Sequence, residues 1–285
     1  MLKLIVEFAE ADERIRVALM TGSRVDPAAS PDPFQDYDIV YLVTEVEPFR
    51  NRNHVLSGFG PTLVVEEPLL GPWPPDDADE DYHNYNVQFV DGNRIDMVFR
   101  PVDQLPEEQG NSSLIVLSDK DGRVPMLPPP SRLSYAPTPP SESLYAGCCT
   151  GFFFTLSSHI PKTLWRRQLP LLKFYVEVCL RDALLLMLQW DIGIRTDWSE
   201  SIGKKGKDLE THLPPKMWEA YWRTYAGHDY GDLWDSLFIF HDLFRRSAQS
   251  VARRLGFSFP SEQSEGALRL LQHVRSLPEG ARSIY

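Results

Sequence analysis

Residues 18–43 read ALMTGSRVDPAASPDPFQDYDIVYLV and join two apolar segments through a long loop. The first segment ends at a Thr-Gly-Ser-Arg turn, and twelve residues with three prolines separate Ser23 from Asp36. The second segment, residues 39–43, is IVYLV, which is typical of a buried β-strand. The stretch therefore predicts a strand, a loop and a second strand, with acidic side chains where the second strand begins.

Two of those acids, Asp36 and Asp38, are two positions apart. Alternate side chains of an extended strand point to the same face, so we expect the two carboxylates to lie close together. Carboxylates that close repel each other unless a cation lies between them. Hard oxygen ligands on a rigid element suit Mg²⁺, and phosphate oxygens can complete its shell. The turn that contains Gly22 and Ser23 offers backbone N–H groups and a hydroxyl, which can bind a phosphate.

A later hairpin supplies a third acid. An alternating strand pattern is followed by Asp91 and Gly92, a strong two-residue turn signal, and then by RIDMVFR at residues 94–100. Asp96 lies in the middle of this returning strand, on the face opposite its apolar residues. A carboxylate there can complete a metal site or accept the proton of an attacking hydroxyl, and the pattern leaves both roles open.

The chain changes character after a proline-dense segment, residues 124–141. Proline excludes a regular helix or a central strand there, so this segment predicts a connector. Strand patterns dominate before it, and helical periodicity dominates after it. We therefore predict an α+β chain, with a mixed β-sheet and helices over residues 1–135 and an all-α helical bundle over residues 136–285.

The expected elements can be placed approximately along the chain. The first half predicts helices over residues 2–11 and 48–59, strands over 14–20, 38–43, 62–66, 84–90, 94–100 and 114–117, and a Pro-, Gly- and acid-rich loop over 69–81. The second half predicts helices over residues 141–160, 169–190, 206–212, 215–224, 230–256 and 262–276.

Composition restricts the class of function. The chain has 285 residues and a net charge of −11, whereas a protein that tracks a phosphate backbone usually carries a basic patch. We expect no nucleic-acid partner, and the acidic surface suits a cationic small molecule. Three cysteines, two of them adjacent, give no disulfide framework and fit a reducing cytoplasm. We expect no secretory signal and no membrane span, because the apolar runs are short and interrupted.

One basic segment stands out on this acidic protein. Lys204, Lys205 and Lys207 stand among Gly203 and Gly206. A solvated loop is the ordinary interpretation of such a segment. The glycines also leave the backbone adaptable, so a lysine can reach a nucleotide phosphate.

The Gly-Ser turn, the spacer, the Asp-x-Asp pair and the later strand aspartate together resemble the active-site pattern of the polymerase-beta-like nucleotidyltransferases. Along nearly its whole length the chain resembles the aminoglycoside 6-adenylyltransferases, which modify streptomycin. The matching segments are DERIR (12–16), GSRV (22–25), FQDYDIVYLV (34–43), DGNRIDMVF (91–99), LWRRQLP (164–170), LLLMLQWDIGI (184–194), SIGKKGK (201–207) and the closing LP-x-x-A-x-x-IY (277–285).

This resemblance implies transfer of AMP from ATP to a hydroxyl of streptomycin, at the 6-position, with Mg²⁺ and release of pyrophosphate. Such an activity gives antibiotic resistance. The first domain is then the nucleotidyltransferase domain and the second the substrate-binding domain of a cytoplasmic monomer. The expected site residues are Asp36, Asp38 and Asp96 for metal binding and catalysis, and Gly22, Ser23, Arg24, Lys204 and Lys207 for the nucleotide.

Two alternatives stay open at this stage. In the first, the protein is a nucleotidyltransferase with a different acceptor, either another aminoglycoside or a protein hydroxyl. In the second, the protein binds a nucleotide without catalysing a reaction. A polycationic acceptor requires acids around it, since a buried charge without a partner is costly. Candidates for this role are Glu66, Glu67, Asp191 and Asp197, although each taken singly is typical of a surface charge.

Overall fold

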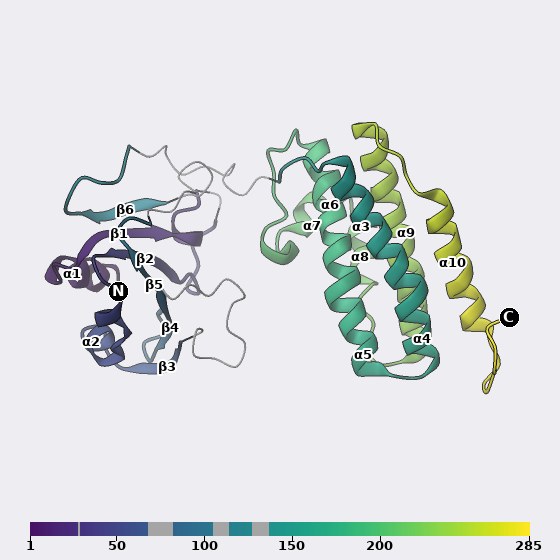
Figure 1. Cartoon of the computed structure of the whole chain (residues 1–285), viewed down its shortest axis with the longest axis horizontal. Coiled ribbons are helices and arrows are strands. Elements are labelled where there is room, and N and C mark those ends of the chain that lie inside the picture. Colours follow the sequence, from purple (N-terminus) through teal and green to yellow (C-terminus); the bar gives the residue numbers. More distant parts are fainter. Residues whose placement is uncertain (28, 68–81, 105–113, 127–136) are drawn as a thin grey trace. The chain divides into compact units, whose positions relative to one another are not determined.

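The computed structural model describes residues 1–27, 29–67, 82–104, 114–126 and 137–285. It divides into two compact units, Met1–Ser134 and Tyr135–Tyr285. The described part of the first unit holds a β-sheet with helices, and that of the second holds helices without strands (Figure 1). The predicted α+β class, with the sheet first and the helical bundle second, is confirmed. The predicted loop over 69–81 and residues 127–136 of the predicted connector lie outside the described residues.

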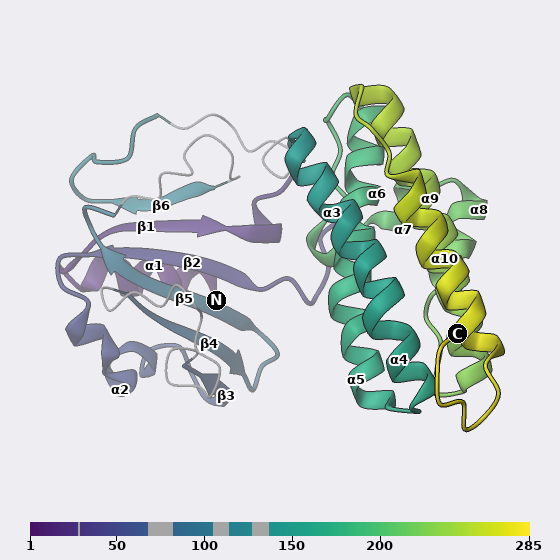
Figure 2. The ribbon, with the colours of Figure 1, turned by 45° about the vertical axis from the view of Figure 1, so that its right-hand side comes forward.

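In the described part of the first unit, six strands form a mixed sheet in the order β3-β4-β5-β2-β1-β6 (Figure 2). The central strand β2 is parallel to β5 and antiparallel to β1. Strands β4 and β5 form the hairpin that the Asp-Gly turn predicts. The strands are β1 (Ile15–Thr21), β2 (Tyr37–Val43), β3 (Thr62–Glu66), β4 (His83–Phe89), β5 (Arg94–Pro101) and β6 (Ile115–Asp119).

An aromatic core covers one face of this sheet. Helix α1 (Leu2–Ala11) contributes Ile5 to a buried cluster that also contains Tyr41 and Phe99. The rings of Tyr41 and Phe99 stack with their centroids 5.1 Å apart, and the Tyr41 hydroxyl donates to the Ile5 carbonyl at 3.3 Å. Because side chains alternate along a strand, this packing turns the residues between the aromatic ones to the opposite face.

The single helix predicted over residues 48–59 is wrong in extent. The structure has a 3₁₀ turn, Glu47–Arg50, followed by a short helix α2, Arg52–Leu56. Between them, the side chain of Asn51 accepts hydrogen bonds from the backbone N–H groups of Asn53 and His54. This N-cap starts a new helix, and such local side-chain bonds compete with a continuous one.

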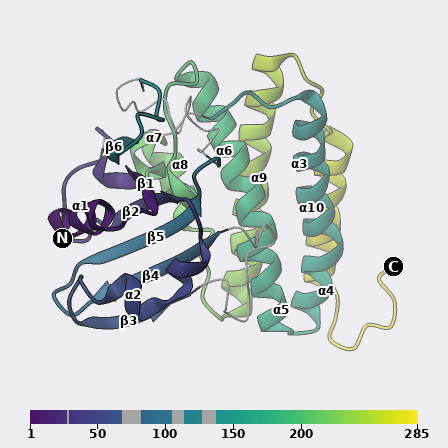
Figure 3. The same cartoon turned by 60° about the vertical axis from the view of Figure 1, so that its left-hand side comes forward.

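The second unit is a helical bundle with its own aromatic core, in which the rings of Phe152 and Phe244 stack 3.8 Å apart. Helices α3, α6, α9 and α10 run alongside one another (Figure 3). No described helix is both long and apolar enough to cross a membrane. The helices are α3 (Glu142–Phe154), α4 (Ile160–Trp165), α5 (Leu169–Phe174), α6 (Arg181–Arg195), α7 (Leu209–His212), α8 (Pro215–Trp222), α9 (Tyr230–Leu255) and α10 (Ser261–Ser276).

Two of the predicted long helices contain a widened turn. Thr155–His159 and Tyr175–Leu180 are π-helical, and they separate α3 from α4 and α5 from α6. Each π-helical turn carries one ring of a stacked pair, His159 and Tyr175, whose centroids are 4.7 Å apart. Such bulges leave the apolar periodicity on both sides in place, so the sequence pattern alone indicates one continuous helix.

Candidate active site

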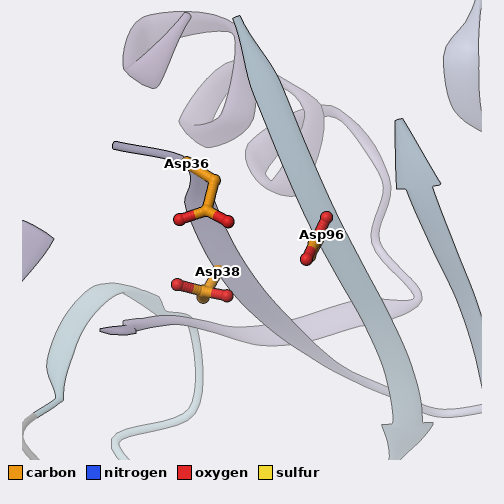
Figure 4. A group of neighbouring side chains, drawn as sticks. All are labelled: Asp36, Asp38 and Asp96. Carbon is orange, nitrogen blue, oxygen red and sulfur yellow. The ribbon is translucent and has the colours of Figure 1, made fainter. Parts of the chain in front are cut away.

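The two parallel strands β2 and β5 bring the predicted acids together. Their register aligns Asp38 directly with Asp96, and Asp36 precedes β2 by one residue. One carboxylate oxygen of each acid lies within 4.8 Å of the others, and all three residues are half-buried. Figure 4 shows the three carboxylates on the same side of the sheet. The structure therefore groups the three acids that the sequence selects, and their role in metal binding stays a prediction.

The Gly-Ser turn packs directly against this cluster. Residues Gly22–Arg24 form a 3₁₀ turn at the end of β1, and Thr21 pairs with Asp38. Gly22 has a φ of +77°, and a Cβ atom added there would lie 1.8 Å from Asp38 Oδ2. Glycine is therefore required twice over, by the left-handed backbone and by the contact with the acid.

Arg24 connects the turn to the segment that carries the first acid. Its Nε donates to the Asp36 carbonyl at 2.9 Å, and its Nη2 donates to the Gln35 carbonyl at 2.6 Å. The Arg24 guanidinium carbon also lies 3.8 Å from the ring centroid of Tyr37. In addition, Gln35 Nε2 donates a hydrogen bond to the Ser23 carbonyl at 3.2 Å. In this structure Arg24 positions Asp36, and its predicted contact with a phosphate stays a prediction.

Sequence reasoning missed Arg94, which lies among the three acids. Its Nη2 donates to Asp96 Oδ2 at 2.6 Å and its Nε to Asp96 Oδ1 at 2.9 Å. The same Nε is 3.9 Å from Asp36 Oδ2. The hydrogen bonds that Asp96 accepts from Arg94 raise the pKa of Arg94 above its usual value, and the nearby Asp36 and Asp38 add to this. Strand alternation puts Arg94 on the face of Asp96, so the spacing of RID could have revealed it.

A polar row continues from the acids to the edge of the sheet. Asn86 pairs in register with Asp96 on one side and with Glu66 on the other. Its Nδ2 donates to Glu66 Oε2 at 2.8 Å. Directly paired residues of neighbouring strands point to the same face, so Thr21, Asp38, Asp96, Asn86 and Glu66 form one row. The row presents the three carboxylates of Asp38, Asp96 and Glu66 beside two neutral polar side chains, which suits a cationic ligand.

Comparison with known proteins identifies the family of this chain. A family model described as streptomycin adenylyltransferase matches residues 1–274. The chain belongs to the streptomycin adenylyltransferase family.

Relatives of this family member align over nearly its whole length. It is 30% identical over 277 residues to the aminoglycoside 6-adenylyltransferase of Bacillus subtilis (strain 168), with 96% of each chain covered. It is 30% identical over 258 residues to that of Campylobacter jejuni, covering 90% of this chain and 88% of the relative. A crystal structure of an aminoglycoside 6-adenyltransferase from Bacillus subtilis is 28% identical, covers 97% of this chain and 98% of that one, and gives a TM-score of 0.49. The family match and the identities to these two relatives confirm the resemblance inferred from the motifs.

In this adenylyltransferase family member the acid cluster fits a hard divalent cation. Mg²⁺ is usually bound by one or two carboxylates together with waters and substrate phosphates, rather than by a closed protein cage. The three acids offer such carboxylates within 4.8 Å of one another, and each is accessible enough to take a ligand. Arg94 neutralises only part of their charge, so the cluster still attracts a cation.

The remaining predicted residues lie in the second unit. Lys204 and Lys207 are exposed, and their contact with a nucleotide stays a prediction. Lys205 forms an ion pair with Asp182 at 3.0 Å. Asp191 is buried with an oxygen 3.5 Å from Arg195 Nε, so it already has an internal counter-charge.

The two adjacent cysteines, Cys148 and Cys149, are not poised for nucleophilic chemistry. All three cysteines of the chain are free thiols. Burial raises the pKa of Cys148 to about 12 and that of Cys149 to about 11. The reactive form of cysteine is the thiolate, so neither residue is a nucleophile at neutral pH.

Proposed function

We propose that this protein transfers AMP from ATP to the 6-hydroxyl of streptomycin, with Mg²⁺ and with release of pyrophosphate. Membership of the streptomycin adenylyltransferase family over residues 1–274 supports adenylylation of a drug hydroxyl. The names of the relatives support an aminoglycoside as the acceptor class and the 6-position as the site. The observation that carries the chemistry is the cluster of Asp36, Asp38 and Asp96 beside the Gly22 turn.

The proposed reaction is a direct displacement at the α-phosphorus. The acceptor hydroxyl oxygen forms a bond to this phosphorus, the bond to the bridging oxygen breaks, and pyrophosphate leaves with the electron pair. Asp36 and Asp38 would hold Mg²⁺, which would neutralise charge on the phosphate oxygens. The hydroxyl proton passes to Asp96 or, where Asp96 would instead complete the metal site, to solvent water. Catalysis is then mainly a matter of positioning and electrostatics.

The other predicted residues have distinct tasks in this proposal. The backbone N–H groups of the turn at Gly22–Arg24 and the Ser23 hydroxyl bind the nucleotide phosphates. Lys204 and Lys207 supply further positive charge to the phosphates. The helical unit binds the acceptor, and acids pair with the cationic groups of the drug.

A mass measurement tests the proposal. The protein is incubated with ATP, Mg²⁺ and each member of a panel of aminoglycosides, and the masses of the drugs and the yield of pyrophosphate are determined. We expect one AMP on streptomycin, one pyrophosphate for each AMP transferred, and no reaction in EDTA. AMP on another drug or on a protein contradicts the assigned acceptor. ATP binding without any transfer contradicts catalysis.

A further inference from the structure

Arg94 places a permanent positive charge inside a group of three acids. Its guanidinium takes both oxygens of Asp96, at 2.6 and 2.9 Å, and also lies 3.9 Å from Asp36. A planar guanidinium on a carboxylate in this two-pronged arrangement is a strong charge-assisted pair. The arrangement therefore competes with any other cation that needs the same carboxylates.

We propose that Arg94 is an exchangeable counter-cation of the active site. It pairs with Asp96 before the nucleotide binds, and it moves to the nucleotide phosphates once a divalent cation occupies the acids. This inference rests on the proposed function, because it assumes that the acids bind a metal and that the protein binds ATP.

Either role of Asp96 requires this exchange. As a metal ligand, Asp96 brings a divalent cation next to the guanidinium, and the two positive charges repel each other. As a general base, Asp96 must offer a carboxylate oxygen to the acceptor hydroxyl, and both of its oxygens already accept hydrogen bonds from Arg94. In both cases Arg94 has to release the carboxylate before the reaction proceeds.

The environment of Arg94 allows such a movement. Its side chain is 47% exposed, so little packing is lost when the guanidinium leaves Asp96. Its fork of N–H donors matches phosphate oxygens as well as it matches a carboxylate. A divalent cation held by the acids would attract the nucleotide phosphates to the part of the sheet that carries Arg94.

The test measures metal and nucleotide binding separately in Arg94→Gln. Mn²⁺ serves as the probe for the metal and is titrated without nucleotide, with free Mn²⁺ followed by electron paramagnetic resonance. ATP binding is then measured with Mg²⁺ and without acceptor, by equilibrium dialysis. We expect Mn²⁺ to bind roughly three- to tenfold more tightly than in the wild type, and ATP to bind more weakly by a similar factor.

Arg100→Gln is the matched control. Arg100 lies on the same strand and the same face, six residues or about 20 Å from Arg94, and its guanidinium is 5.4 Å from the ring centroid of Tyr82. The control removes the same charge, and we expect both affinities to stay within twofold of the wild type. Arg94→Lys keeps the charge and loses the fork, so we expect wild-type Mn²⁺ affinity with weakened ATP binding.

Opposite shifts of the two affinities in Arg94→Gln support the proposal, provided that circular dichroism shows a folded protein. Unchanged or weaker Mn²⁺ binding makes Arg94 a structural support of Asp96 and overturns the proposal. Tighter Mn²⁺ binding with unchanged ATP binding also overturns it, because no transfer to phosphate takes place. If the Asp38→Asn variant binds Mn²⁺ as tightly as the wild type does, the acids are not the metal site. The proposed function then fails, and not merely the role of Arg94.

Discussion

At the scale of single residues, the geometry of the site depends on the absence of one side chain. Gly22 lies against Asp38 so closely that a Cβ atom would come within 1.8 Å of the carboxylate. Its φ of +77° also lies in the region that L-residues rarely adopt. These two effects can be separated experimentally, because Gly92 has a similar φ of +89° and open space around it.

We predict that backbone strain lowers the free energy of unfolding by a similar amount, about 1 kcal/mol, in Gly22→Ala and in Gly92→Ala. Only Gly22→Ala displaces Asp38, so we expect its AMP transfer to fall at least about 100-fold while Gly92→Ala stays near the wild type. Turnover and thermal unfolding of both variants check this. Equal losses of activity in the two would show that the contact with Asp38 is unimportant.

A second residue-scale prediction concerns acid stability. Arg14 donates to both oxygens of Asp12, at 2.9 and 2.6 Å, and these bonds lower the pKa of Asp12 to about 2. The unfolded-state pKa is about 3.9, so the carboxylate stabilises the fold above that pH and this contribution is lost as the pH falls through about 2.

We expect Asp12→Asn to lower the free energy of unfolding by about 1–2 kcal/mol at pH 7, allowing for solvent screening of the partly exposed Arg14. At pH 3 the difference in the free energy of unfolding between this variant and the wild type should be about half of its value at pH 7. Urea unfolding of both proteins at the two pH values measures it. A difference that does not change with pH would contradict the assigned ion pair.

At the scale of elements, the strands were predictable and their long-range pairing was not. Alternation and the Asp-Gly turn locate β4 and β5 to within one or two residues. The parallel pairing that aligns Asp38 with Asp96 joins segments about 60 residues apart in the chain, and no local pattern specifies it. Arg94 was missed because the prediction considered only the acids of this strand. The Asn51 cap was missed because the single helix was predicted to begin at Pro48.

The polar row across the sheet leads to an element-scale prediction. Three strand spacings separate Asp38 from Glu66, about 14 Å in all, which allows contact with several cationic groups of one acceptor. We expect Glu66→Gln to raise KM for streptomycin about three- to tenfold with little change in kcat. The variant loses a negative charge that binds the drug, whereas the reacting groups are unchanged.

Glu67→Gln provides the control for this variant. Glu67 is the next residue, and its substitution removes the same charge. Its carboxylate, however, lies 3.6 Å from the buried His83. Steady-state kinetics with streptomycin should therefore show the rise in KM for Glu66→Gln alone. A rise of the same size in both variants would assign the effect to net charge and not to the row.

At the scale of the whole molecule, the two units contribute different kinds of information. The three acids, the turn and Arg94 all belong to Met1–Ser134, and their chemistry follows from residue types and spacing. The helical unit, Tyr135–Tyr285, has a separate core and carries Lys204 and Lys207. Its helices were predictable from periodicity, but the acceptor was not, because surface acids such as Asp197 have no spacing that identifies a drug.

The central claim is that the acid cluster carries AMP transfer, and one comparison tests it most directly. Single-turnover transfer of AMP to streptomycin is measured for Asp38→Asn and for Asp103→Asn, which makes the same charge change at an exposed residue just after β5. We expect Asp38→Asn to be at least about 1,000-fold slower than the wild type with its fold intact, and Asp103→Asn to match the wild type. Transfer by Asp38→Asn at the wild-type rate would contradict the account.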